Sequence, residues 1–230
     1  MKLLQGLKIV FAFVVSGFPL GPAHAHPHVW VTMEMDVELD DHREIISFRH
    51  KWTFDGAYTA FAVEGLATNG DGLYSEEELK PLAQTNIEAL KDFEYFTFPF
   101  IGDKKLALKD PVDYRLEYKD KLLTLYFTVP LATPVPYEKI QDFSVAVYDP
   151  TIYVSLTFAG GSPVKIVSAQ PAPCTAHVSS PPQRAGNLLR GLPRQTNRPR
   201  RHVGIFRPTG DKLDSIGSQF AERVTIVCTP

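Results

Sequence analysis

Two runs of strictly alternating apolar and polar residues constrain the fold of this chain more than any other feature. From His28 to Asp40 every second residue is apolar, beginning with Val29, and the pattern returns over Ile46–Phe54 with Ile46 on the apolar face. A period of two is typical of a strand with one buried face. Because the turn-forming residues Asp40–Arg43 separate the runs, they predict a β-hairpin.

The rest of the chain favours an α+β fold that is mainly antiparallel β, either sandwich-like or an open barrel. Hydrophobic residues make up 44% of the sequence, which is enough for a core. Short alternating runs separated by turn residues are typical of sandwiches and barrels. The further expected strands lie at Tyr114–Tyr118, Leu123–Val129, Phe143–Val147, Ile152–Phe158, Cys174–Val178 and Val224–Cys228.

Two helices are expected between the first hairpin and these later strands. The first covers 55–66, and the second covers about 76–92, where apolar residues recur at helical spacing. Ser75 and Glu78 have the spacing of a capping box, with Ser75 as the N-cap of the second helix. The helices therefore predict a helix-loop-helix inserted at about 55–92.

The loop at 67–78 follows the spacing of an EF-hand calcium loop, with Gly72 at the position of the sharp turn. Ala67 stands at the first ligand position, where the template has Asp, and the loss of a carboxylate weakens such a site. A weak Ca²⁺ site and a helix-loop-helix without metal both remain open. The candidate ligands are Asn69, Asp71, the carbonyl of Leu73, Ser75 and Glu78.

The first 25 residues have the layout of a secretory signal peptide. Lys2 and Lys8 precede the apolar stretch Ile9–Leu20, and Ala23–Ala25 is a small-x-small cleavage site. We expect export to the periplasm and a mature chain that begins at His26, with an uncleaved N-terminal anchor as the alternative. The sequence after residue 25 contains no apolar run of membrane-spanning length, so no transmembrane segment is expected in the mature protein.

His26 and His28 are the candidate ligands for a divalent transition metal. The α-amine of the mature chain and the imidazoles suit Ni, Co, Cu or Zn. Pro27 has no N–H group, which excludes chelation through a deprotonated amide at that position. Two histidines that merely lie in solvent at a cleavage junction are the alternative. His50 falls on the apolar face of its strand and is expected in the core.

The chain contains two cysteines, Cys174 and Cys228. Both lie in strand-like runs, and an oxidising compartment favours disulfides. We therefore expect a Cys174–Cys228 disulfide that returns the last strand to the β body. No zinc-protease, nucleophile-elbow or phosphate-loop motif occurs in the sequence, so a non-enzymatic role is expected, with an unrecognised hydrolase as a remote alternative.

Charge is divided unevenly along the chain. The net charge is only −2, so no global basic field predicts a nucleic-acid partner.

The predicted organisation is a signal peptide (1–25), a β-rich domain (26–179), a disordered basic segment rich in Arg and Pro (180–212) and a returning strand (213–230). Residues 181–210 of this segment are interpreted either as a genuine linker or as a stretch read out of frame between two compensating frameshifts.

Seven segments together resemble a family of exported bacterial proteins described as periplasmic components of an uncharacterised ABC-type transport system. The resemblance implies an association with nickel/cobalt-type metal permeases, and members usually carry Asp where this chain has Ala67. The segments are His26–Val31, Arg49–Phe61, Gly65–Leu79, Phe93–Phe98, Asp113–Tyr118, Val147–Phe158 and Phe220–Cys228.

These features lead to one expected function and one alternative. We expect a non-enzymatic periplasmic accessory protein of metal-ion transport or homeostasis, with an inner-membrane metal permease or transport component as its partner. The alternative is a β-rich protein-interaction module of an envelope transport assembly that binds no metal.

Overall fold

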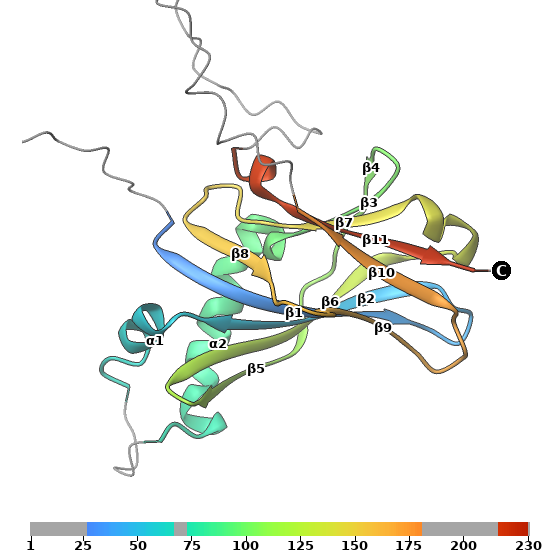
Figure 1. The fold of residues 1–230 in the computed structure, drawn as a ribbon. Helices are drawn as coiled ribbons and strands as arrows, with labels where there is room; N and C mark the ends of the chain where they lie inside the picture. The colour runs from blue at the N-terminus through green and yellow to red at the C-terminus, as the bar shows by residue number, and fades with distance from the viewer. Residues whose placement is uncertain (1–26, 67–72, 181–215, 230) are drawn as a thin grey trace, which may run out of the picture.

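The alternating runs form two β-sheets in the computed structural model, which describes residues 27–66, 73–180 and 216–229 (Figure 1). Sheet A has the order β5-β6-β2-β1-β8, and β9 continues along the same edge of β1 as β8. Its strands are β1 (Val29–Leu39), β2 (Ile45–Phe54), β5 (Val112–Lys119), β6 (Leu122–Val135), β8 (Val154–Phe158) and β9 (Val164–Ser168).

Sheet B has the order β10-β11-β7-β3-β4. The strand pairs of both sheets are antiparallel except those of β1 with β8 and β9, and the described strands form no closed barrel. The structure therefore confirms a mainly antiparallel β fold with two sheets. The strands of sheet B are β3 (Thr97–Ile101), β4 (Lys104–Lys105), β7 (Phe143–Val147), β10 (Cys174–Ser179) and β11 (Glu222–Cys228).

The two expected helices are present, but both are shorter than predicted. The first, α1 (Gly56–Ala62), stops where the chain enters a turn that contains Gly65 at a φ of 77°, a conformation that ends helices. The second, α2 (Glu76–Leu90), begins with the predicted Ser75–Glu78 capping box. The 3₁₀ helices are η1 (Lys91–Phe96), η2 (Tyr137–Asp142) and η3 (Ile216–Phe220).

Residues 67–72, which would form the first half of the EF-hand-like loop, lie outside the described residues, so that geometry stays a prediction. Within the described ranges, no helix is long and apolar enough to cross a membrane.

The inner faces of both sheets and one face of α2 meet in one hydrophobic core. As predicted, β1 buries every second residue from Val29 to Leu39, and α2 buries Leu79, Ala83 and Ile87 on successive turns. A large side chain contributes about 1.5–3 kcal/mol when it is fully buried, so this core supplies much of the folding free energy. Its largest members include Trp52, Phe48, Phe127, Phe143 and Met33.

The first residues of β2 depart from strict alternation. Ile45 and Ser47 are buried while Ile46 is only half-buried, so the inward position expected for Ile46 is wrong. The register of β2 shifts here against both neighbouring strands, between Ile45 and Ser47 on the β6 side and opposite Glu38 and Leu39 on the β1 side. An irregularity of this kind changes which residues face inward, and the predicted alternation holds from Phe48 onward.

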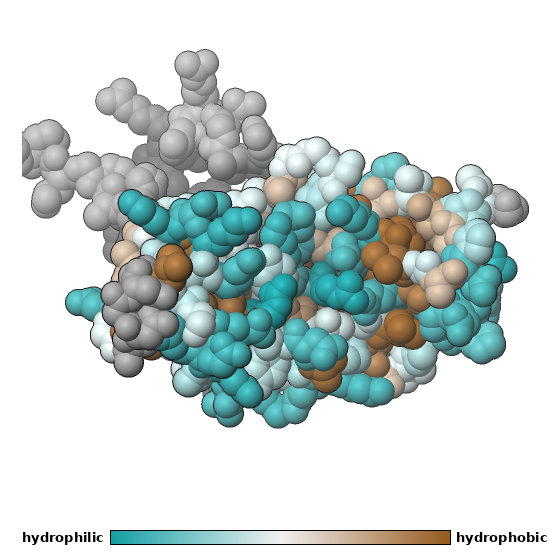
Figure 2. Space-filling model, turned by 90° about the horizontal axis from the view of Figure 1, so that it is seen from below, coloured by the Kyte–Doolittle hydropathy of each residue, from teal (hydrophilic) through white to brown (hydrophobic). Residues whose placement is uncertain are grey.

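The outer face of sheet A is polar and carries several ion pairs. Lys51 Nζ lies 2.6 Å from Glu34 Oε1 across the β1–β2 pair, and Arg49 pairs with both Glu38 and Asp36. Figure 2 views the molecule from the side on which β1, β2 and β5 lie, and this surface is mostly hydrophilic with smaller apolar patches. Solvent therefore covers one side of sheet A and the core covers the other.

His50 is fully buried in the core, as predicted, but only one of its ring nitrogens has a partner. Its Nε2 lies 3.1 Å from Thr97 Oγ1. Because the Thr97 hydroxyl donates its hydrogen to the Tyr95 carbonyl, the Nε2–H group of His50 donates to Thr97 Oγ1. Nδ1 has no hydrogen-bond partner among the described residues. Burial between aromatic rings, with Phe127 stacked at 4.8 Å, lowers the pKa of His50 to about 3.

This buried histidine makes the stability of the fold depend on pH. In the unfolded chain the His50 pKa is about 6.5, so below that pH the unfolded chain binds a proton that the folded protein excludes. The contribution of neutral His50 to the free energy of unfolding is fully present above pH 6.5. It declines as the pH falls toward 3, by at most about 1.4 kcal/mol per pH unit. We expect His50→Gln to flatten the dependence of urea-unfolding free energy on pH in this window.

The exposed His42 provides the matched control, since it lies in the β1–β2 turn. His42→Gln should leave the slope of the wild-type curve unchanged. Parallel curves for the wild type and His50→Gln would contradict the assignment of the pH dependence to His50.

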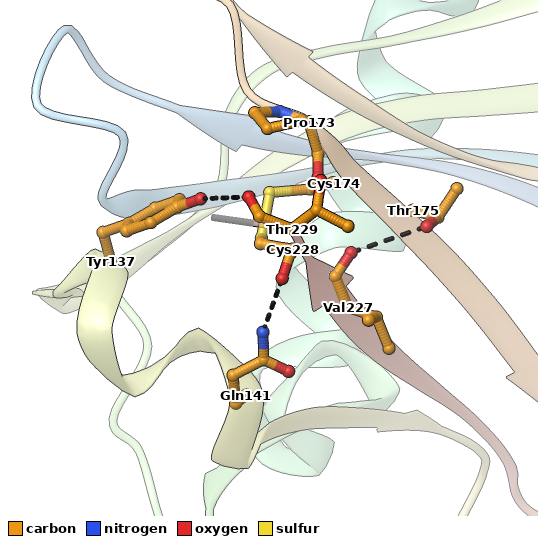
Figure 3. The surroundings of a disulfide bond; sticks show 8 residues. All are labelled: Tyr137, Gln141, Pro173, Cys174, Thr175, Val227, Cys228 and Thr229. Carbon is orange, nitrogen blue, oxygen red and sulfur yellow. Dashed lines mark hydrogen bonds between the residues drawn. A yellow bond between two sulfur atoms is a disulfide. The ribbon is translucent and has the colours of Figure 1, made fainter.

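The predicted disulfide between Cys174 and Cys228 is present and joins β10 to β11 in register (Figure 3). The η2 segment holds this end of sheet B, because Gln141 Nε2 donates to the Cys228 carbonyl at 2.8 Å and Tyr137 Oη donates to the Thr229 carbonyl at 3.4 Å. β11 also pairs with β7 on its other edge, so the last strand is an interior strand of sheet B.

The double variant Cys174→Ser/Cys228→Ser should fold but lose about 4 kcal/mol of unfolding free energy. The expected loss follows from loop closure across a sequence separation of 54 residues, in a model where the bond restricts the unfolded chain. Urea unfolding of both forms measures the difference. Non-reducing peptide mapping that finds two free thiols in exported protein would contradict the pairing.

Candidate functional site

His28 is anchored beside the turn that leads into β8. Its backbone N–H donates to the Tyr153 carbonyl at 2.9 Å, and its ring lies 4.9 Å from the Tyr153 ring, centroid to centroid. The side chain remains exposed. His26, the other predicted transition-metal ligand, lies outside the described residues.

Asp149 shapes the turn that carries Tyr153. It is only 3% exposed, yet its carboxylate is well satisfied. It accepts hydrogen bonds from the Thr151 N–H and hydroxyl at 2.7–2.9 Å and from the Val154 N–H at 2.8 Å. A buried charge requires such partners. Asp149 therefore fixes both the turn and the first residue of β8, and so sets the position of the His28–Tyr153 contact.

Asp55 connects the same end of β1 to helix α1. Its Oδ2 accepts the Trp30 N–H at 2.8 Å, while its Oδ1 caps α1 by accepting from Ala57 and Tyr58 at 2.8 and 2.9 Å. Partial burial alone would raise the pKa of Asp55, but these three N–H groups hold the pKa below its usual value. One carboxylate thus joins the start of β1 to the N-terminus of α1.

A cavity of about 400 Å³ lies next to the His28–Tyr153 contact, between the Asp149 turn, β8 and η3. The carboxylates of Asp149 and Glu222 line it. Like Asp149, Glu222 accepts hydrogen bonds, from the Phe158 N–H at 2.6 Å and from the Ser180 hydroxyl at 3.0 Å. Pro27, the residue before His28, also lines the cavity. The remaining lining residues are Tyr148, Ile152, Val154, Ser155, Leu156, Thr157, Gly217 and Phe220.

Gly217 allows η3 to close one side of this cavity. A Cβ atom at this position would lie 2.0 Å from the Asp149 carbonyl oxygen, a distance that no side chain tolerates. The backbone of η3 can therefore pack against the Asp149 turn only with glycine at 217.

The calcium-loop residues are only partly described. Asn69 and Asp71 lie outside the described residues. Ser75 and Glu78 form the capping box of α2, in which Glu78 Oε2 accepts from both the N–H and the hydroxyl of Ser75 at 2.8 Å. Leu73, whose carbonyl was the other candidate ligand, is 62% exposed. The local structure therefore confirms the helix cap, and calcium binding stays a prediction.

Within the described part of the chain, no three His, Cys, Asp or Glu side chains group closely enough to hold a metal ion. A site with three ligands of these types at His28 would need a contribution from elsewhere, and the predicted His26 with its α-amine has suitable chemistry. The exposed imidazole of His28 contains nitrogen atoms of the type that ligates transition metals. The ring of His28 lies tilted by 40° against the Tyr153 ring.

Sequence reasoning missed Tyr153, Glu222 and the full role of Asp149. The Asp149–Pro150 pair predicts a turn, but it does not predict that the Asp149 carboxylate is buried. Tyr153 and Glu222 carry no local signal for their roles, since their partners His28 and Phe158 are distant in the sequence. Asp55, the first residue of the helix predicted at 55–66, has the residue type of an N-cap.

Asp55→Ala should destabilise the protein by about 1–2 kcal/mol, because it removes the N-cap of α1 and leaves the Trp30 N–H without its partner. Urea unfolding at neutral pH measures the change. Asp41→Ala in the exposed β1–β2 turn is the control and should stay within about 0.5 kcal/mol of the wild type. Equal unfolding free energies for Asp55→Ala and the wild type would show that the link does not stabilise the fold.

The comparisons with known proteins identify relatives but no activity. The chain is 24% identical to an uncharacterized protein of Haemophilus influenzae over 229 residues, which covers 99% of this chain and 98% of that protein. It is 31% identical over 98 residues to an uncharacterized 15.5 kDa protein of Spirochaeta aurantia, covering 43% of this chain and 69% of that protein.

No solved structure matches the chain. The family described as "Protein of unknown function (DUF1007)" matches residues 11–228. The chain therefore belongs to the DUF1007 family of proteins of unknown function.

Proposed function

We propose that this protein is an exported, non-enzymatic accessory of transition-metal transport or homeostasis, in which His26 and His28 bind a divalent ion. The observation that carries the proposal is the anchoring of His28, whose backbone and ring both contact Tyr153 while the imidazole stays exposed. A ligand held in place before binding loses less conformational freedom when the metal arrives. Imidazole and amine nitrogens suit Ni, Co, Cu or Zn.

Two features support an extracytoplasmic location for this function. The first 25 residues have the composition of a signal peptide, and Cys174 and Cys228 form a disulfide, a bond that persists mainly in oxidising compartments. In the periplasm the proposed partner is an inner-membrane permease or transport component of the nickel/cobalt type. The 67–78 loop serves as a weak Ca²⁺ site or as a purely structural element.

A protein-interaction module without metal is the second candidate, and exposed aromatic residues favour it. Trp30 is 53% exposed and Tyr153 is 50% exposed. Each is next in sequence to a member of the Val29–Val154 pair, at one end of the β1–β8 pairing. Exposed aromatic side chains are enriched at protein interfaces. Metal analysis separates the two candidates, because an interaction module of this kind binds a partner without an ion.

The metal proposal predicts that protein purified from the periplasm begins at His26 and binds Ni, Co, Cu or Zn stoichiometrically. His28→Asn should abolish stoichiometric binding, whereas the exposed-histidine variant His177→Asn should bind as the wild type does. An extra alanine before His26 should weaken binding, because it moves the α-amine away from the imidazole. Intact-mass measurement establishes the first residue, and elemental analysis with calorimetry measures the metal.

Three results would contradict this proposal. One is a mature chain that begins elsewhere, since the α-amine would then not belong to His26. Another is the absence of all four metals from periplasmic protein together with no binding in calorimetry. The third is equal affinity in the wild type and His28→Asn.

A further inference from the structure

The outward edge of β8 faces the cavity, and no strand among the described residues pairs with it. β8 lies at the end of its sheet path, with β1 as its paired strand among the described residues. The Tyr153 carbonyl accepts from β1, and the Ala159 N–H donates to the Met33 carbonyl. Backbone groups alternate sides along a strand, so those of Val154, Leu156 and Phe158 point away from β1, toward the cavity side.

The protein's own carboxylates cap two positions of this edge. Asp149 accepts the Val154 N–H at 2.8 Å, and Glu222 accepts the Phe158 N–H at 2.6 Å. Leu156 lies between them, and its outward N–H and carbonyl have no strand partner among the described residues. Unpaired edge groups of this kind form a template for a further strand.

The walls of the cavity suit an apolar side chain. Phe220 stands at one side with 63% of its surface exposed, and Tyr148 and Ile152 line the cavity as well. The lining contributed by the described residues includes two carboxylates, Asp149 and Glu222, and no lysine or arginine. The groove therefore combines an apolar centre, an open peptide group and negative charge at both ends.

We propose that this groove binds an extended peptide segment of a partner protein, which adds to β8 as an antiparallel strand. One residue of the peptide would exchange two hydrogen bonds with Leu156 and place an apolar side chain against Phe220. Basic residues on either side of it would lie near Asp149 and Glu222. This inference does not depend on metal binding by His26 and His28.

A short peptide of the proposed chemistry tests the groove. The peptide acetyl-Lys-Thr-Val-Thr-Lys-amide, titrated into ¹⁵N-labelled full-length mature protein, should shift the Leu156 amide resonance and slow its hydrogen exchange. Methylating the valine nitrogen removes the donor to the Leu156 carbonyl and should weaken binding by up to about tenfold. A peptide with glutamate in place of both lysines should bind less tightly still.

Two surface variants provide a matched comparison on the protein side. Phe220→Ala should weaken peptide binding severalfold because it removes a wall of the cavity. Val227→Ala removes another exposed apolar side chain near the C-terminus, outside the cavity lining, and should bind the peptide as the wild type does. Both positions are exposed, so the variants should fold.

Several outcomes would overturn the proposal. They are an unshifted Leu156 amide at millimolar peptide, equal binding of the methylated peptide, equal binding of the glutamate peptide, or equal losses in Phe220→Ala and Val227→Ala. Protection of the Leu156 amide in peptide-free protein would also overturn it. The groove would then be occupied by the chain itself, or by a second copy if protection rises with protein concentration.

Discussion

The fold depends on the two edges of β1. One edge pairs with β2 along almost its whole length, and the other is shared by β8 over Val29–Met33 and by β9 over Met35–Leu39. The inward residues of this strand are almost fully buried, so its alternation fixes which face of sheet A meets the core. A one-residue slip would turn that apolar set toward solvent. The positions of the Asp149 turn and of the β9–β10 connection to sheet B follow from this pairing.

The division of one edge between two short strands also creates the candidate site. β8 spans only Val154–Phe158, and its outer edge lies where sheet A separates from η3 and β11. An open edge is a liability for a folded protein, and here Asp149 and Glu222 cap its ends. The same carboxylate that caps Val154 holds the turn that positions Tyr153 against His28. The His28 contact and the groove are therefore products of one local structure, although they support separate proposals.

The sequence predicted the elements whose signals are local. The β1–β2 hairpin, the Ser75–Glu78 cap and the buried position of His50 follow from alternation and residue type, and the Cys174–Cys228 bond follows from the number of cysteines and the compartment. The parallel pairing of β8 and β9 with β1 was not predictable, because a period of two identifies a strand and not its partner. The register irregularity near Ile46 likewise depends on two neighbours. Tyr153 and Glu222 join the site only through tertiary structure.

The arrangement of sheet B explains why the chain tolerates the basic sequence at residues 181–210. β10 and β11 are antiparallel neighbours, and their register runs from the Cys174–Cys228 pair to the Ser179–Arg223 pair. The disulfide and the pairing of β11 with β7 fix this register without reference to the connecting sequence. The free energy of closing a loop grows only by about 0.6 kcal/mol for each doubling of the loop length. A genuine basic linker and a stretch read out of frame are therefore both compatible with sheet B, and the coding DNA distinguishes them.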